Sequence, residues 1–387
     1  MPKVCFFDFN INFGGAPIGS VSLCSGLIKQ NVDVKIYDVY GKNDKYINFI
    51  EEKQVPFDVI SPESKRVYIE GGVVWKRCVS FLIQLPDFVK IAFRTRRMLK
   101  RDEIELVWVN NSKSLALISV ASLGLGIKKV LYHRGWAQSE SISFFFFSLI
   151  KYQCSTLIAH SHATVGNLKS LFPHANVVYV PNSVSLRLDI CEAPRRLGND
   201  FKILLPAARP VREKGHHVAV KALSRVLHQS RRRVVLHFPG EIAVGVDDSY
   251  MFELRRLIKS SHLIDNVEFT GWLDNLQAAI HEADVVILPS HTEGFPRVII
   301  EAMLLKVPVI ATPVGGIPEA IFHEETGLIV DMEDPDSLAD AIMFIMENPV
   351  NVARITENAH SFAKRYFSPE TQVKEVKEAF YGVLDHE

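Results

Sequence analysis

Cysteine, net charge and long apolar runs are all scarce in this sequence of 387 residues. The five cysteines are scattered and never form a Cys-x-x-Cys pair, which argues against a disulfide framework or a zinc site and indicates a reducing compartment. Lys and Arg total 44, as do Asp and Glu, so no global field favours nucleic acid as a partner. The longest apolar stretches, SLALISVASLGLGI and SISFFFFSLI, fall short of the roughly 20 residues that a membrane-spanning helix needs.

The motifs of several enzyme classes are also missing. No group of His, Cys, Asp and Glu has metal-ligand spacing, so no metal site is predicted. A Ser-centred nucleophile elbow and a Walker A loop are likewise absent. The first residues, MPKVCFFDFN, enter a strand directly and lack the basic start and long apolar region of a signal peptide, so we expect a cytoplasmic protein.

What the sequence does contain is a regular alternation of short apolar runs and helix-length segments. Near-continuous apolar strands of this kind are typical of parallel sheets that are covered on both faces. The pattern restarts after Asn182, beyond a polar segment without a clear period, SVSLRLDICEAPRRLGND. The sequence therefore predicts an α/β protein of two doubly wound, Rossmann-like domains that face a cleft. The expected boundaries are an N-terminal domain over 1–182, a linker over 183–200, a C-terminal domain over 201–367 and an amphipathic helix over 368–387.

Two carboxylates, Glu293 and Glu301, flank the segment EGFPRVIIE, which follows the strand-like run ADVVILPS. Pro296 suits the start of a helix, so Glu293 is expected in the loop at the carboxyl end of a strand and Glu301 in the helix. The backbone N–H groups of Gly294 and Phe295 should be free there, in a crevice of the kind that binds nucleotides. The arrangement suits a hydroxyl-rich ligand such as a sugar. Taken alone, it equally suits an ordinary helix start with a surface glutamate.

Cations and glycines follow other predicted strands. Arg209 and Lys214, in LLPAARPVREKGHHVAV, are placed to clamp a diphosphate, although a solvated basic loop would look similar. The segments FNINFGGAPIGS and VIATPVGGIPEAI each open a helix with glycines, which suits either a phosphate contact or a tight turn. His133 ends the strand in VLYHRGWAQSE and is expected to point into the cleft, although a lone histidine is more often a packed or surface residue.

Together these segments resemble the retaining glycosyltransferase family 4, the glycosyl transferases group 1 type, which has the GT-B fold. The resemblance is dense over residues 200–340, through AARPVREKG, FPGE, GWLDNLQAAIHEADVVILPSHTEGFPRVIIEAM and VPVIATPVGGIPEAI. It is sparser before, through FGGAPIGS, RRMLKRDEIELVWVNN, the HRG tripeptide and VVYVPNSV. The sequence departs from the family pattern at Ser183, Ala208 and FPGE, and none of these changes removes a charged position.

The resemblance implies transfer of a sugar from a UDP-, GDP- or ADP-sugar, with retention at the anomeric carbon and without a metal ion or cofactor. It implies that Glu301 binds the ribose and that Glu293, with the Phe295 backbone, binds the donor sugar. Arg209 and Lys214 would hold the diphosphate, and the last helix would cross back to pack on the N-terminal domain. The remaining implied positions are catalytic His133, facing the donor sugar, and donor-binding Gly15, Gly240, Gly294 and Pro296.

The acceptor is predicted from a basic segment of the N-terminal half. Residues 71–101 mix aromatic and basic side chains, as a helix on an anionic membrane surface does and as basic helices of this family also do. We prefer a glycan or lipid-linked saccharide acceptor in surface polysaccharide or lipopolysaccharide assembly, with peripheral contact of the N-terminal domain at the inner face of a membrane. The alternatives are a sugar-nucleotide epimerase of the same fold and a non-catalytic, nucleotide-sugar-binding subunit of a transferase complex.

Overall fold

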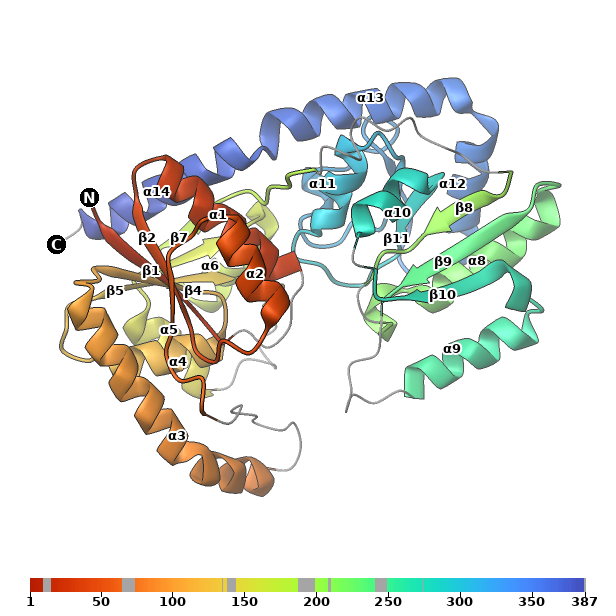
Figure 1. Ribbon diagram of the computed structural model, residues 1–387. Coiled ribbons are helices and arrows are strands. Elements are labelled where there is room, and N and C mark those ends of the chain that lie inside the picture. Colours follow the sequence, from red (N-terminus) through yellow and green to blue (C-terminus); the bar gives the residue numbers. More distant parts are fainter. Residues whose placement is uncertain are drawn as a thin grey trace. The chain divides into compact units, whose positions relative to one another are not determined.

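Two parallel sheets organise the chain, and each belongs to a separate unit (Figure 1). The N-terminal unit comprises Met1–Pro181 and Pro369–Glu387, and the C-terminal unit comprises Asn182–Ser368. The computed structural model describes residues 1–9, 15–64, 74–133, 135–137, 144–186, 199–207, 210–240, 249–273 and 275–385.

The sheet of the N-terminal unit has the order β3-β2-β1-β4-β5-β6-β7, with parallel neighbours throughout. Successive side chains of a strand point to opposite faces, and both faces of the inner strand Lys3–Asp8 are buried. Val4 and Phe6 pack in one core and Cys5 and Phe7 in the other, all four without exposed surface. The strands are β1 (Lys3–Asp8), β2 (Asp33–Asp38), β3 (Phe57–Val59), β4 (Leu106–Val109), β5 (Lys128–His133), β6 (Thr156–Ala159) and β7 (Val177–Tyr179). The helices are α1 (Gly15–Lys29), α2 (Asp44–Glu52), α3 (Val74–Arg101), α4 (Ser112–Ala121), α5 (Phe144–Gln153), α6 (His162–Leu171) and α14 (Pro369–Leu384).

The C-terminal unit repeats this plan with the order β10-β9-β8-β11-β12-β13, again parallel throughout. Along its central strand, Val285 and Ile287 enter one core and Val286 and Leu288 the other. The strands are β8 (Phe201–Leu204), β9 (Val234–Pro239), β10 (Val267–Gly271), β11 (Val285–Leu288), β12 (Val309–Ala311) and β13 (Leu328–Ile329). The helices are α8 (His216–Gln229), α9 (Ser249–Ser260), α10 (Leu276–Glu282), α11 (Arg297–Leu304), α12 (Pro335–Glu347) and α13 (Pro349–Tyr366), with short 3-10 turns η2 (Arg212–Lys214), η3 (Ile264–Asn266) and η4 (Ile317–Glu319).

The last helix, α14, belongs to the N-terminal unit, where it packs against α1. Val376 and Phe380 are buried in the core that covers one face of the sheet. Gln372 donates hydrogen bonds to the Tyr132 hydroxyl at 3.2 Å and to the Pro181 carbonyl at 2.9 Å. The apolar face of α14 thus packs against residues of the N-terminal unit that lie far away in the sequence.

The segment interpreted as a linker, 183–200, begins inside the C-terminal core. Val184 is buried there and Leu186 packs against the same cluster, so these two residues act as core. Residues 187–198 of that segment lie outside the described part of the chain.

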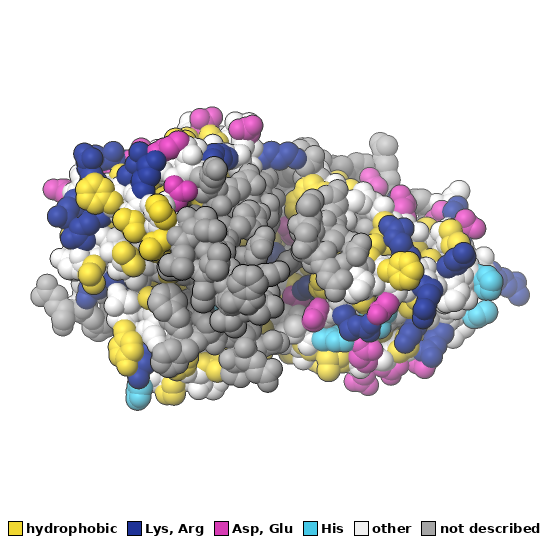
Figure 2. Space-filling view, turned by 90° about the horizontal axis from the view of Figure 1, so that it is seen from below, with side chains coloured by type: hydrophobic (Ala, Val, Ile, Leu, Met, Phe, Trp, Pro, Cys, Tyr) yellow, Lys and Arg dark blue, Asp and Glu magenta, His cyan; other side chains and the backbone are white. Residues whose placement is uncertain are grey.

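Helix α3 presents an apolar stripe. Leu85, Val89 and Phe93 follow one another at intervals of four and therefore share a face, and all three are exposed. Figure 2 views the molecule from the side on which α3 lies in Figure 1, and hydrophobic and basic side chains lie side by side at its left. No described helix combines the length and apolar character needed to cross a membrane.

The basic residues of α3 divide into two groups. Lys90 and Arg94 both pair with Glu63, at 2.7 and 2.5 Å, so their charges are largely committed within the unit. Arg97 and Lys100 are exposed, and neither has an ion-pair partner among the described residues. The side chains of the first helical turns, which include Lys76 and Arg77, are outside the described set.

Candidate active site

The C-terminal sheet has a topological switch point between β8 and β11. Successive connections run one way from β8 to β9 and β10, and the other way from β11 to β12 and β13. In open α/β sheets, ligands bind outside the carboxyl ends of the strands at such a point. The loop after β8 carries Lys214 and the loop after β11 carries Glu293, so the fold brings both predicted residues to this place.

Lys214 and Glu293 are in direct contact. Lys214 Nζ donates to Glu293 Oε1 at 2.6 Å, and Ser290 Oγ donates to the same oxygen at 2.9 Å. The side chain of Lys214 is 31% exposed and that of Glu293 11%, so the pair is partly shielded from water. Glu293 Oε2 has no hydrogen-bond partner among the described residues, which leaves acceptor capacity for a ligand hydroxyl.

Two glycines with left-handed backbones hold the loops around this pair. Gly215 has φ +69°, and a Cβ there would lie 2.0 Å from the Pro289 carbonyl oxygen. Gly315 has φ +57°, and a Cβ there would lie 1.8 Å from the Glu293 carbonyl oxygen. Only glycine fits both the conformation and the close approach. The glycines of GHHVAV and VGGIP therefore have a packing role next to the candidate site.

The start of helix α11, after Glu293, is held in place by packing in the core and by a hydrogen bond to its backbone. The Phe295 ring is buried in the core against Phe367, with ring centroids 5.1 Å apart, and Asn182 Nδ2 donates to the Phe295 carbonyl at 2.9 Å. Pro296 stands at the N-cap position with extended backbone, one residue before α11 begins. The N–H groups of Gly294 and Phe295 have no hydrogen-bond partner among the described residues. The backbone of this loop, and not the Phe295 ring, is what can meet a ligand.

Glu301 lies in α11 and faces α10. Gln277 Nε2 approaches its Oε1 at 3.5 Å and also donates to the Ser185 carbonyl at 3.2 Å. Burial raises the pKa of the Glu301 carboxyl, and nearby Arg297 together with Gln277 opposes that rise. A buried carboxylate with few polar partners among the described residues is poorly solvated, and it can therefore accept hydrogen bonds from ligand hydroxyls.

The N-terminal unit carries two further predicted residues. His133 ends β5, and its buried Nε2 has no hydrogen-bond partner among the described residues. Burial lowers the pKa of His133, against a backbone hydrogen bond with Gly135, so the ring is neutral at pH 7. Gly15 is the exposed first residue of α1, and a Cβ there would meet no described atom within 4 Å.

Gly240 borders a segment that is not described, and Arg209 lies within another such segment. Gly240 follows β9 with φ +130°, and its N–H donates to the Gly271 carbonyl at 2.8 Å. Arg209, predicted to hold the diphosphate with Lys214, lies outside the described residues.

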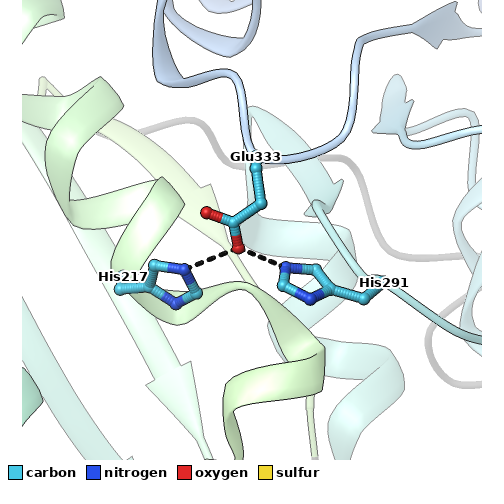
Figure 3. A group of neighbouring side chains, drawn as sticks. All are labelled: His217, His291 and Glu333. Carbon is cyan, nitrogen blue, oxygen red and sulfur yellow. Dashed lines mark hydrogen bonds and ion pairs between the residues drawn. The ribbon is translucent and has the colours of Figure 1, made fainter.

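Sequence reasoning missed a cluster beside the candidate site. His217 comes from the first turn of α8 and His291 and Glu333 from two loops, and one ligand atom of each lies within 4.8 Å of the others (Figure 3). They lie 74 and 42 positions apart along the chain, so no local spacing could reveal them. Asn182 and Gln277, which contact Phe295 and Glu301 from distant parts of the chain, were missed for the same reason. Ser290 was missed although it is only three residues from its partner Glu293.

Comparison with known proteins gives the family. Residues 192–362 match the model described as "Glycosyl transferases group 1". The GDP-mannose-dependent alpha-(1-6)-phosphatidylinositol monomannoside mannosyltransferase of Mycobacterium tuberculosis is 32% identical over 273 residues, which are 64% of this chain and 68% of that relative. The chain belongs to the glycosyl transferases group 1 family. The predicted resemblance is thereby confirmed.

A second relative of this glycosyl transferases group 1 member is N-acetyl-alpha-D-glucosaminyl L-malate synthase of Bacillus anthracis. It is 27% identical over 239 residues, and the match covers 60% of this chain and 61% of the relative, so the chain spans less than two thirds of its length.

Solved structures confirm the predicted GT-B fold. Anabaena HepE in complex with UDP and glucose superposes with a TM-score of 0.79 at 21% identity, over 98% of this chain and 100% of that chain. Sucrose-phosphate synthase from Thermosynechococcus elongatus gives 0.78 at 17% identity, over 100% of both chains. At these identities the likeness establishes the fold of this glycosyl transferases group 1 member.

Proposed function

We propose that this protein is a retaining glycosyltransferase that moves a sugar from a nucleotide-diphosphate sugar to a glycan or lipid-linked saccharide. The observation that carries the proposal is the Lys214–Glu293 pair at the switch point of the C-terminal sheet. It places a cation and a carboxylate where an open α/β sheet binds its ligand. Membership of the glycosyl transferases group 1 family supports the same reading.

Donor binding would exchange the partners of this pair. Lys214 turns from Glu293 to the diphosphate, where it acts with Arg209, and the released Glu293 carboxylate accepts hydrogen bonds from hydroxyls of the donor sugar. The N–H groups of Gly294 and Phe295, which have no partner within the described part of the chain, add donors beside it. In the free protein the Glu293 carboxylate is paired with the Lys214 ammonium group, so neither charge is unpaired in this partly buried place before the donor binds.

The two glutamates have different environments and therefore different proposed roles. Glu293 lies in a loop with a lysine and a serine hydroxyl, and binds the reacting sugar. Glu301 lies in a helix, desolvated, and binds the ribose hydroxyls, which replace the water it lacks. Gly240 and Pro296 complete the donor-binding set. The proposed donor is a UDP-, GDP- or ADP-sugar.

In the transfer step the bond between the anomeric carbon and the diphosphate breaks, and the diphosphate leaves with the bonding electrons. Lys214 and Arg209 stabilise the charge that develops on it. The acceptor oxygen bonds to the same face of the sugar, and a donor phosphate oxygen takes its proton. No resident cofactor or divalent metal takes part in these steps. The chemistry needs only positioned charge and exclusion of water.

The N-terminal unit is the proposed acceptor unit. The buried Nε2 of His133, which has no partner among the described residues, is suited to a hydrogen bond with a sugar hydroxyl, and no described atom lies close to the Cβ position of Gly15 at the start of α1. The apolar stripe of α3, continued by Arg97 and Lys100, is suited to the surface of an anionic membrane. A peripheral enzyme at the inner face of a membrane would thereby meet a lipid-linked acceptor of polysaccharide assembly.

A thermal-shift panel of UDP-, GDP- and ADP-sugars, with wild type beside Glu301→Ala, tests the donor site first. One sugar nucleotide should stabilise the wild type and lose that effect in the variant. The same donor is then incubated with and without a saccharide acceptor. Conversion of the donor sugar without any acceptor would indicate an epimerase, and binding without turnover under all conditions would indicate a non-catalytic subunit. Stabilisation by no sugar nucleotide contradicts the proposal.

A further inference from the structure

A cluster of two imidazoles and one carboxylate lies beside the candidate active site and is not used by the proposed transfer (Figure 3). His217 stands in the first turn of α8, His291 in the loop after β11, and Glu333 in the loop between β13 and α12. Glu333 Oε1 lies between the rings, 2.8 Å from His217 Nε2 and 2.5 Å from His291 Nε2.

The ligand atoms are already directed at one point. His217 Nδ1 is 2.9 Å from the Tyr250 hydroxyl, which also accepts from the His217 backbone N–H at 3.2 Å, so the ring is held from behind. The backbone N–H of His291 donates to the Glu213 carbonyl at 2.8 Å. Glu333 has φ +59°, a left-handed conformation that glutamate rarely adopts, and this turn aims its carboxylate at the rings.

Among the described residues, Glu333 has no Lys or Arg within ion-pair distance, and its two charged-group partners are the histidines. His291 Nε2 is buried and, despite its short distance to the carboxylate, is not aligned to hydrogen bond with any described residue.

We propose that His217, His291 and Glu333 bind a divalent transition-metal ion of the zinc type. Two imidazole nitrogens and one carboxylate oxygen form a zinc ligand set, and solvent takes the fourth, tetrahedral position. At metal–ligand distances of about 2.0–2.1 Å the ligand atoms lie about 3.3 Å apart, so the carboxylate oxygen moves away from each imidazole nitrogen by less than about 1 Å. His217 then donates its Nδ1 proton to the Tyr250 hydroxyl, which fixes the metal-binding tautomer.

The ion would tie together three segments of the C-terminal unit, which are the segment that begins α8, the loop after β11 and the loop after β13. Two of them also carry Lys214 and Glu293, which are close in sequence to His217 and His291 respectively. The site goes beyond the proposed transfer, in which no metal participates, and its role is to stabilise these loops. Its test therefore measures metal binding and folding, and its outcome does not depend on whether the transfer proposal holds.

The test uses the full chain, stripped with a chelator and titrated with Zn²⁺ against a chromogenic competitor. The wild type should bind one equivalent and melt at a higher temperature with Zn²⁺ than without it. Glu333→Gly removes a ligand and suits the left-handed backbone, so it folds while its affinity falls at least about tenfold. His291→Ala should weaken binding similarly, and Tyr250→Phe about tenfold through the lost support of His217. Co²⁺ in place of Zn²⁺ should give the visible absorption of a tetrahedral site in the wild type and not in Glu333→Gly or His291→Ala.

The control is His228→Ala, which removes an exposed histidine from the same helix as His217. It should bind Zn²⁺ as the wild type does. The proposal is overturned if the wild type binds no Zn²⁺ equivalent. It is equally overturned if Glu333→Gly and His291→Ala keep the affinity of the wild type, because the ion then binds elsewhere.

Discussion

Lys214 and Glu293 are 79 positions apart in the chain, and their side chains meet at 2.6 Å because β8 and β11 are neighbours in one sheet. Their contact makes each the natural counter-charge of the other in the ligand-free protein. A diphosphate competes for the lysine, and a sugar hydroxyl competes for the carboxylate. The pair can therefore respond to both halves of a nucleotide sugar.

Lys214→Met should lower kcat more than donor affinity. The lysine stabilises charge that grows on the leaving diphosphate, and loss of one such group typically costs about 10²–10³-fold in kcat. Steady-state kinetics with the donor found by thermal shift, together with its Kd, measure the two effects separately. Lys221→Met, an exposed lysine of α8, is the matched control and should behave as the wild type. An unchanged kcat in Lys214→Met would remove this residue from the mechanism.

Gly215→Ala should destabilise the C-terminal unit. The left-handed backbone and the Pro289 carbonyl at 2.0 Å from the new Cβ together should lower the free energy of unfolding by more than about 2 kcal/mol. Urea unfolding measures the change. Gly166→Ala, in α6 with no described atom within 4 Å of the new Cβ, should instead raise it by about 0.5–1 kcal/mol. Equal effects of the two substitutions would contradict the packing role of Gly215.

Glu301→Gln should stabilise the free protein and abolish its response to the donor. The folded-state pKa of Glu301 is raised by burial, so the wild type loses stability as pH rises from the ordinary carboxyl pKa of about 4.3 through the raised value. The variant has no such loss. Its melting temperature should exceed that of the wild type at pH 7, and the gap should close below about pH 4. Glu325→Gln controls for the change in net charge, and a constant gap across this range would count against a buried, ionised Glu301.

Phe93→Glu should reduce binding to vesicles that contain anionic lipid. Phe93 is 62% exposed on the α3 stripe, and a carboxylate there replaces apolar contact with repulsion from the lipid headgroups. Vesicle sedimentation at low and high salt measures the effect. Phe252→Glu, at a phenylalanine that is 74% exposed in the C-terminal unit, should bind as the wild type does. If the wild type does not sediment, or if both variants match it, the membrane proposal fails.

Most of the fold could be predicted from the sequence, because parallel strands that are buried on both faces have continuous apolar sequences. The run ADVVILPS, for example, contains β11, with side chains in both cores. The strand β3 was not predicted, because Phe57–Val59 is only three residues long, half-buried and at the sheet edge, directly after Pro56. Val184 was assigned to a linker because local polarity hides a residue whose partners lie in the C-terminal core.

The candidate site was predictable residue by residue but not as a set of contacts. Glu293 and Lys214 stood out through their loops, yet their ion pair depends on strand order, which no local pattern encodes. The partners of Lys90 and Arg94, and the meeting of His217 with His291, depend on the same non-local information. The sequence shows which residues lie in loops. Which of these loops contact each other follows only from the order of the strands in the sheet.

The order of the chain also sets an order of completion during synthesis. The C-terminal unit is continuous from Asn182 to Ser368, whereas the N-terminal unit includes α14, which follows it. Until the ribosome has released α14, the N-terminal sheet lacks the apolar cover that Val376 and Phe380 provide, worth about 1.5–3 kcal/mol for each buried side chain. The N-terminal unit therefore begins to be synthesised first but is completed last. The part of its sheet that α14 covers is accessible to chaperones while the C-terminal unit is being translated.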